Sequence, residues 1–203
     1  MKHQPCAEIL SGLEAAYLPD FFDLARADAL FVHCRGLTWR NEHIRMFGHM
    51  RAVPRLTTWY GDSGVVYRYS GETHVAETWT DVLAALRDRL QEALAARFNF
   101  VLGNFYRNGR DSMGWHADDE TELGRDPLIV SLSFGATRRL RFRRRAGTTQ
   151  SSDGNRTGYV DLTHGSMLMM WGRSQREWQH ALPRTARDVG ERINLTLRRV
   201  FPT

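Results

Sequence analysis

The sequence of 203 residues has only two cysteines, one lysine and no long apolar run. Cys6 and Cys34 show no repeated spacing, which excludes a disulfide framework and predicts free thiols in a reducing compartment. No apolar stretch approaches the ~18 residues that a membrane span needs, and the N-terminus lacks the apolar core of a signal peptide. We therefore expect a soluble, cytoplasmic protein with no membrane partner.

Because lysine is nearly absent, 27 of the 28 basic residues are arginine, and the net charge is +5. This balance excludes an acidic solvating protein and permits a polyanionic partner. Arginine suits bidentate contacts with phosphate, although the coding bias of a GC-rich genome explains the same excess. The six arginines within 138–145 have two interpretations, a stripe that follows phosphates or a solvated outer face.

The chain length and composition are those of one globular unit, with 42% hydrophobic and 25% charged residues. Short strands predominate after residue 98, and helices are expected before it. The pattern predicts an α+β fold, a jelly roll (double-stranded β-helix) with N-terminal helices and a strand or hairpin segment. We divide it into an extension with a supporting helix at 1–98 and a jelly-roll core at 99–203, within one compact domain. The expected helices are Glu8–Tyr17, Pro19–Leu30 and Thr80–Phe98, and the expected core strands are Phe100–Tyr106, Leu128–Phe134, Arg138–Phe142, Tyr159–Leu162, Ser166–Trp171 and Arg192–Val200.

The strongest local signal for chemistry is the triplet His116-Ala117-Asp118. Residues two apart on a strand point to the same face, so both side chains can reach one ion. His180 would be the third ligand. Two imidazoles and one carboxylate form the facial triad of non-haem Fe(II) oxygenases, although an isolated His-x-Asp often occurs by chance.

A row of polar residues alternates along the last expected strand. Arg192, Asn194, Thr196 and Arg198 share one face there, and Asn104 and Tyr106 alternate in the same way on an earlier strand. Buried arginines are costly unless they meet an anion, such as the carboxylates of a keto diacid. Periodicity alone also allows Arg192 and Arg198 to lie on the exposed face of an edge strand.

Six motifs occur in an order and spacing that resemble the AlkB family. The resemblance extends from about residue 47 to residue 200, and it is most similar to the branch of the human DNA-repair homologues. The motifs are Asn104-x-Tyr106, Asp111-Ser112-x-x-x-His116-x-Asp118-Asp119-Glu120, Ser131–Ala136, Gly165-Ser166-x-Leu168-Met169-Met170, His180 and Arg192-x-Asn194-Leu195-Thr196-x-Arg198.

This resemblance implies an Fe(II)- and 2-oxoglutarate-dependent dioxygenase that uses O2 to remove alkyl groups from nucleobases such as N1-methyladenine and N3-methylcytosine. It implies that His116, Asp118 and His180 are the catalytic iron ligands. It also implies that Arg192 and Arg198 pair with the two carboxylates of 2-oxoglutarate. Three further residues would assist them, namely Asn104, Tyr106 and Asn194. The side chain of Asn194 could serve the strand ladder instead.

The resemblance also implies a nucleotide-recognition segment within 1–98, because a base in a duplex must be flipped out to react. Tyr67 and Tyr69 resemble the segment that stacks on the base, and Glu120 could recognise the edge of the base. Phe47, which precedes Arg55 as in a wedge-bearing hairpin, could fill the gap that the base leaves. Packing within the protein explains these tyrosines and Phe47 equally well.

We expect a monomer that acts on alkylated DNA, single- or double-stranded. Two alternatives remain open at this stage. The first is a 2-oxoglutarate oxygenase that acts on RNA, protein or a small molecule. The second is a non-catalytic jelly-roll module that binds metal or nucleic acid.

Overall fold

The computed structural model describes residues 7–9, 12–46, 49–69, 72–147 and 156–201. None of the helices in these ranges is long and apolar enough to cross a membrane. The helices are α1 (Leu24–Arg35), α2 (Asp81–Leu94), the short 3-10 helix η1 (Thr121–Leu123) and α3 (Ser174–Glu177). The strands are β1 (Ala7–Glu8), β2 (Ala15–Leu18), β3 (His43–Met46), β4 (His49–Ala52), β5 (Leu56–Gly61), β6 (Val66–Tyr69), β7 (Glu72–Val75), β8 (Glu77–Thr78), β9 (Phe100–Tyr106), β10 (Met113–His116), β11 (Ile129–Gly135), β12 (Arg138–Arg144), β13 (Thr157–Leu162), β14 (Ser166–Met170), β15 (Trp178–Leu182) and β16 (Arg192–Arg198).

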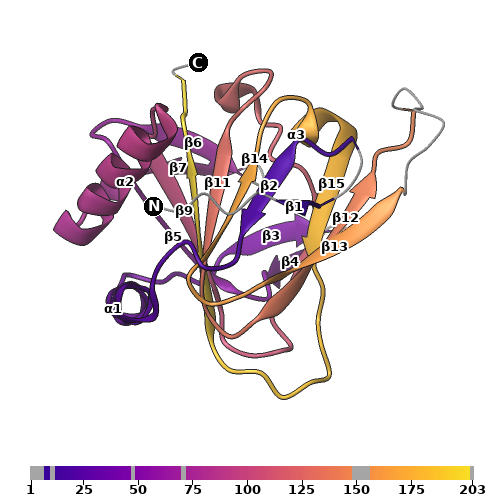
Figure 1. The fold of residues 1–203 in the computed structure, drawn as a ribbon, viewed down its shortest axis with the longest axis horizontal. Helices are drawn as coiled ribbons and strands as arrows, with labels where there is room; N and C mark the ends of the chain where they lie inside the picture. The colour runs from indigo at the N-terminus through magenta and orange to yellow at the C-terminus, as the bar shows by residue number, and fades with distance from the viewer. Residues whose placement is uncertain (1–6, 10–11, 47–48, 70–71, 148–155, 202–203) are drawn as a thin grey trace.

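Two sheets and a helical layer make up the fold (Figure 1). The large sheet has eight strands in the order β1-β2-β14-β11-β16-β9-β5-β8, and the small sheet has four in the order β10-β15-β12-β13. Two hairpins, β3–β4 and β6–β7, are separate from both sheets. The crossing connections are those of a jelly roll, so the predicted fold class is confirmed.

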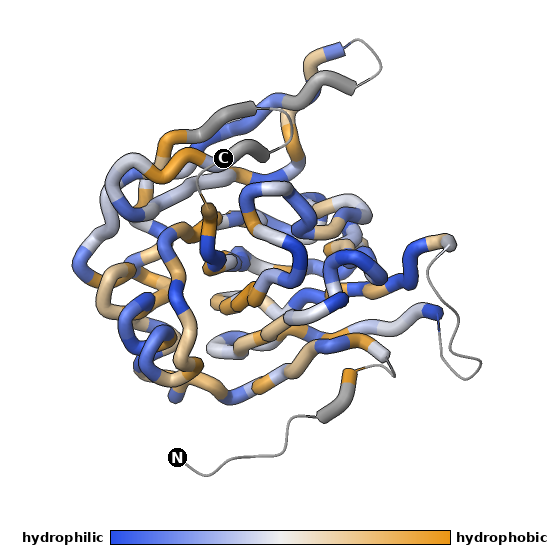
Figure 2. The backbone as a smooth tube through the Cα atoms, turned by 90° about the horizontal axis from the view of Figure 1, so that it is seen from above, coloured by the Kyte–Doolittle hydropathy of each residue, from blue (hydrophilic) through white to orange (hydrophobic). Residues whose placement is uncertain are grey.

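The large sheet buries both of its faces. On one face, α1 and α2 pack against alternate residues of the central strands, for example Leu86 of α2 with Leu132 and Leu195 in one hydrophobic cluster. On the other face, a second cluster joins the large sheet to the small one. In Figure 2, hydrophobic and hydrophilic stretches alternate along the chain, as expected for elements with one face in a core. Polar side chains that point between the two sheets are therefore enclosed.

The first predicted helix, Glu8–Tyr17, is wrong. This segment contains β1 and β2, and β2 pairs with β14 in an antiparallel ladder from Leu18 to Ala15. Alanine favours a helix by only a few tenths of a kcal/mol, and the backbone hydrogen bonds of this ladder outweigh that preference. The following helix begins at Leu24 after the Asp23 N-cap, later than predicted.

The long helix begins where the sequence predicts it and ends earlier. Thr80 caps α2 by accepting a hydrogen bond from the backbone of Leu83. The helix stops at Ala95, whose left-handed backbone (φ 48°) ends the regular pattern before Phe98. The core strands predicted after residue 98 are all present within two residues of their predicted ends.

Candidate active site

The polar face of β16 lines a cavity between the two sheets. The alternation along this strand sends Ile193, Leu195 and Leu197 into the cluster beneath the helices. The intervening Arg192, Asn194, Thr196 and Arg198 line the cavity. Since β16 lies in the middle of the large sheet, the interpretation of an exposed edge strand is excluded. Asn104 and Tyr106 of β9 line the same cavity, as does the cluster of His116, Asp118 and His180.

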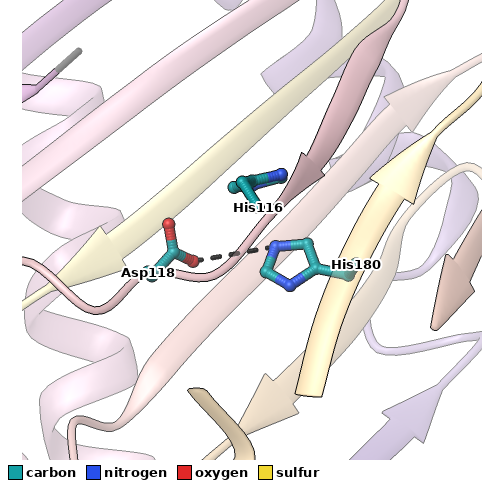
Figure 3. A group of neighbouring side chains, drawn as sticks. All are labelled: His116, Asp118 and His180. Atoms are coloured by element: carbon teal, nitrogen blue, oxygen red, sulfur yellow. Dashed lines mark ion pairs between the residues drawn. The ribbon is translucent and has the colours of Figure 1, made fainter. Parts of the chain in front are cut away.

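His116, Asp118 and His180 come together from separate elements (Figure 3). Their ligand atoms all lie within 4.8 Å of one another. His180 Nε2 is 3.9 Å from Asp118 Oδ2, and the two imidazole centroids are 4.2 Å apart. His116 ends β10 and His180 lies in β15, whereas Asp118 follows β10 in a loop rather than in the predicted strand. Two imidazoles and one carboxylate at this spacing can hold an Fe(II) ion.

A β-bulge turns His116 toward the cavity. Met113 pairs with Leu182 and His116 pairs with His180, so β10 has one more residue than β15 over this stretch. In a regular strand, residues three apart would face opposite sides, yet Met113 and His116 both line the cavity. His116 Nδ1 lies 2.9 Å from Gly114 O, which can only accept, so Nδ1 carries the proton and Nε2 is free to bind a metal.

The protonation states of the three residues suit a cation. Burial lowers the pKa of His116 and lowers the pKa of His180 to about 3, so both imidazoles are neutral at pH 7. Burial by itself would raise the pKa of Asp118, but the pKa is lowered overall, and the charge and hydrogen bond of Arg198 contribute to this. The site therefore presents two neutral nitrogen ligands and one carboxylate without having to release protons at pH 7.

Arg192 is a buried cation with an incomplete set of partners. It is 2% exposed, and its Nη2 donates to Ser133 Oγ at 2.9 Å. Its Nε has no hydrogen-bond partner among the described residues. Burial lowers its pKa to about 10, and the Tyr106 hydroxyl and the charge of Arg138 are among its polar neighbours. A carboxylate of a small dicarboxylic acid would supply the missing acceptor and charge, so this part of the cavity fits 2-oxoglutarate.

Arg198 is bonded within the site itself. Its Nη2 donates to Asp118 Oδ1 at 2.9 Å, and its Nη1 donates to the Tyr67 hydroxyl at 2.6 Å. Tyr67 is fully buried and packs on Phe100. Glu120 lies close enough to Tyr67 and Arg198 that their interactions alter its pKa, which burial raises overall. Tyr67, Arg198 and Glu120 thus extend the polar wall of the site beyond Asp118.

Two amide side chains complete the polar lining, and a buried guanidinium supports one of them. Asn104 Oδ1 accepts from Arg55 Nε at 2.7 Å, so Arg55, which is 5% exposed, supports a residue of the cavity. Asn194 Nδ2 donates to Ser131 Oγ and Leu132 O, at 2.8 and 2.9 Å. These bonds tie Asn194 to the neighbouring strand.

The structure describes only some of the remaining residues that the sequence predicts to contact the substrate. Phe47 lies outside the described residues, and Tyr69 is the last residue of β6. Among the six arginines of 138–145, the side chains of Arg139 and Arg143 face outward, toward Asp161 and Gln179.

Sequence reasoning gave no role to Ser131 and Ser133, which alternate on β11. Ser131 lines the cavity and accepts from Asn194, and Ser133 accepts from Arg192. Their alternation was the signal that could have identified them. The apolar part of the lining had no distinguishing pattern, because each of its strands also contributes core residues. It consists of Leu102, Met113, Leu140, Leu162, Leu168, Met170 and Leu182.

Comparisons with known proteins agree with this geometry. The family model described as 2OG-Fe(II) oxygenase superfamily matches residues 14–198. Alpha-ketoglutarate-dependent dioxygenase alkB homolog 3 of Bos taurus is 40% identical over 188 residues, which cover 91% of this chain and 65% of that protein. DNA oxidative demethylase ALKBH2 of Mus musculus is 41% identical over 202 residues, which cover 95% of this chain and 82% of that protein. The chain thus spans just under two thirds of the alkB homolog 3 proteins that it matches.

The solved structure of OsALKBH1 has the same fold, with a TM-score of 0.64 and 18% identity over 92% of this chain and 98% of that one. The jelly roll, the histidine–carboxylate cluster and the family model together define the class of 2-oxoglutarate- and Fe(II)-dependent oxygenases, which require Fe(II), 2-oxoglutarate and O2. Within this superfamily, the chain belongs to the AlkB family.

Proposed function

We propose that this protein removes alkyl groups from nucleobases in DNA, with N1-methyladenine and N3-methylcytosine as substrates. One observation carries the proposal: the cluster of His116, Asp118 and His180 shares a single cavity with the buried, incompletely paired Arg192. The relative named DNA oxidative demethylase supports DNA as the substrate.

Different residues of the cavity would bind the metal, bind 2-oxoglutarate and exclude water. His116, Asp118 and His180 would hold Fe(II), which when bound would supply the activation of O2 for oxidation of the alkyl carbon. Arg192 and Tyr106 would bind one carboxylate of 2-oxoglutarate, and Asn104 and Asn194 would border it. The positive charge of Arg198, already next to Asp118, would face the other carboxylate. The leucines and methionines of the lining would keep water from the reacting atoms.

The overall reaction balances without an acid or base from the protein. One oxygen atom of O2 enters succinate as 2-oxoglutarate loses CO2, and the other converts the N-methyl group to N-hydroxymethyl. The N–C bond then breaks, which releases formaldehyde and restores the N–H or ring nitrogen of the base. The contribution of the chain is therefore to position the reactants.

We propose that Glu120 recognises the base and that the buried Tyr67, which interacts with Glu120, supports it there. The buried Oε2 of Glu120 has no hydrogen-bond partner among the described residues. An exocyclic amine of adenine or cytosine is a donor that this acceptor could bind. We further propose Phe47, Tyr69 of β6, and Arg55, which lies between β4 and β5, as substrate contacts, with Phe47 as the wedge.

The test is release of succinate and formaldehyde from methylated oligonucleotides of one sequence, offered as single-stranded DNA, duplex DNA and RNA. We expect turnover on at least one DNA substrate and its loss in His116→Ala. His33→Gln, which lies on α1 at the other face of the large sheet, is the matched control and should remain active. Turnover on RNA alone would shift the proposal to RNA, and no turnover on any of the three would overturn it.

A further inference from the structure

Strand β10 carries one proposed iron ligand and leads to another, yet its own pairing is sparse. It is the edge strand of the small sheet, so β15 is its one partner in that sheet. The ladder consists of two pairs, Met113 with Leu182 and His116 with His180, separated by the bulge. Edge strands with irregular pairing are weakly held in register, and a slip of one residue turns every side chain to the other face. This ladder is a weak constraint on His116 and Asp118.

The beginning of β10 is held by a buried side chain from another strand. Arg138 begins β12 and is 3% exposed. Its Nη2 donates to Asp111 O at 2.9 Å and to Pro183 O at 2.7 Å, and its Nη1 donates to Asn108 O at 3.1 Å. Asp111 lies two residues before β10, and Pro183 directly follows β15. One guanidinium therefore fixes the two strands to each other at the same end.

A second buried side chain holds the segment beyond the other end of β10. Gln175 of α3 is 1% exposed, and its Oε1 accepts from the backbone N–H of Asp118 at 2.9 Å. Arg145 also connects α3 to the segment after β10, because its Nη1 donates to Gln175 O at 3.2 Å and to Asp119 Oδ2 at 2.6 Å. The loop position of Asp118 thus depends on contacts with α3, since the ladder ends at His116.

We propose that Arg138 and Gln175 are positioning residues that fix the bulged edge strand at both ends and so set the spacing of His116 and Asp118 in the metal site. The inference rests on the proposed function, in which His116, Asp118 and His180 bind the metal. Neither Arg138 nor Gln175 would contact the metal. They act through backbone atoms that flank the ligands, as groups around metal ligands commonly do.

The experiment titrates Mn2+ into metal-free protein and records its Kd by calorimetry, together with the visible absorption of the Co2+ form. Arg138→Met and Gln175→Leu should each raise the Kd for Mn2+ by about tenfold or more. Their Co2+ spectra should differ from that of the unaltered protein, because the arrangement of ligands changes. The matched controls are Arg139→Met, the adjacent residue on the outer face of β12, and Gln179→Leu, a more exposed glutamine of β15. Both should keep the original Kd and Co2+ spectrum.

Conservative variants separate positioning from general stability. Gln175→Glu keeps an acceptor for the Asp118 N–H and should return the Kd to within about threefold of the original, whereas the shorter reach of Arg138→Lys should restore it only in part. These two variants also carry the test if Arg138→Met or Gln175→Leu does not fold. Unaltered Kd and Co2+ spectra in the folded variants would overturn the inference.

A comparison of the unaltered protein with His116→Ala distinguishes failure of the positioning inference from failure of the proposed function. If the unaltered protein binds Mn2+ and His116→Ala does not, the metal site stands, and the Arg138 and Gln175 variants decide the positioning role. If the unaltered protein and His116→Ala show the same Kd, the metal site and the inference built on it are both overturned.

Discussion

Arg198 donates from Nη2 to Oδ1 of Asp118 over 2.9 Å, and the two residues are 2% and 3% exposed. This pair orients the carboxylate so that its other oxygen, Oδ2, faces His180. In this pair Asp118 balances the charge of Arg198, whereas Arg192 has no carboxylate partner among the described residues and can bind a carboxylate of an anionic co-substrate. Both consequences can be tested by substitution.

Removal of the Asp118 charge should destabilise the metal-free protein. In Asp118→Asn, the guanidinium of Arg198 stays buried and loses the negative charge of Asp118, and removal of one partner of such a buried pair costs about 3 kcal/mol. Urea unfolding of the metal-free protein measures this change in the free energy of unfolding. Asp119→Asn is the control, because its pair with Arg145 is partly exposed to solvent and contributes less than about 1 kcal/mol. Equal losses in the two variants would contradict the prediction.

Replacement of Arg192 should separate co-substrate binding from stability. Arg192→Met removes the cation proposed to bind 2-oxoglutarate, so we expect the KM for 2-oxoglutarate to rise by about a hundredfold or more. The free energy of unfolding without co-substrate should stay the same or increase, because a buried charge with an unpartnered Nε is replaced by an apolar side chain. Succinate release against 2-oxoglutarate concentration and urea unfolding are the two measurements. A lower stability with an unchanged KM would show that Arg192 is structural.

Replacement of Glu120 should weaken the reaction with the methylated base and leave the binding of 2-oxoglutarate unchanged. Glu120→Ala removes the proposed acceptor for an exocyclic amine, and loss of one such hydrogen bond lowers kcat/KM for a methylated oligonucleotide by about tenfold. The KM for 2-oxoglutarate should not change. Glu122→Ala, two residues further in η1, is the matched control and should retain the original kcat/KM. An equal effect of Glu120→Ala on both substrates would argue against base recognition.

The metal-free protein should lose stability as the pH falls below 6.5. Burial lowers the pKa of His180 to about 3, so the unfolded chain takes up a proton in this range while the folded chain does not. Between pH 6.5 and pH 5 this uptake reduces the free energy of unfolding by about 2 kcal/mol. Urea unfolding at pH 7.5 and pH 5 should show a smaller loss for His180→Gln than for the unaltered protein. Equal losses would mean that His180 is protonated in the folded state.

Local patterns predicted the parts of the site that lie on regular strands. The alternation along 192–198 placed four polar residues on one face, and β16 sends all four into the cavity. The same reasoning failed at Asp118, which lies in a loop beyond β10. It also failed at Glu8–Tyr17, where pairing with β14 outweighs the helical preference of alanine.

In the amino-acid sequence, strand periodicity predicted the fold class, because it is a property of short segments, and six motifs that resemble a known family identified the residues proposed to bind iron and a dicarboxylate. The tertiary structure decided how those residues meet. The bulge that turns His116 inward, the pairing of Arg198 with Asp118, and the contacts of Arg138 and Gln175 with the ends of β10 join positions far apart in the chain. Contacts of this kind depend on the packing of the two sheets and their connecting loops, which no local pattern specifies.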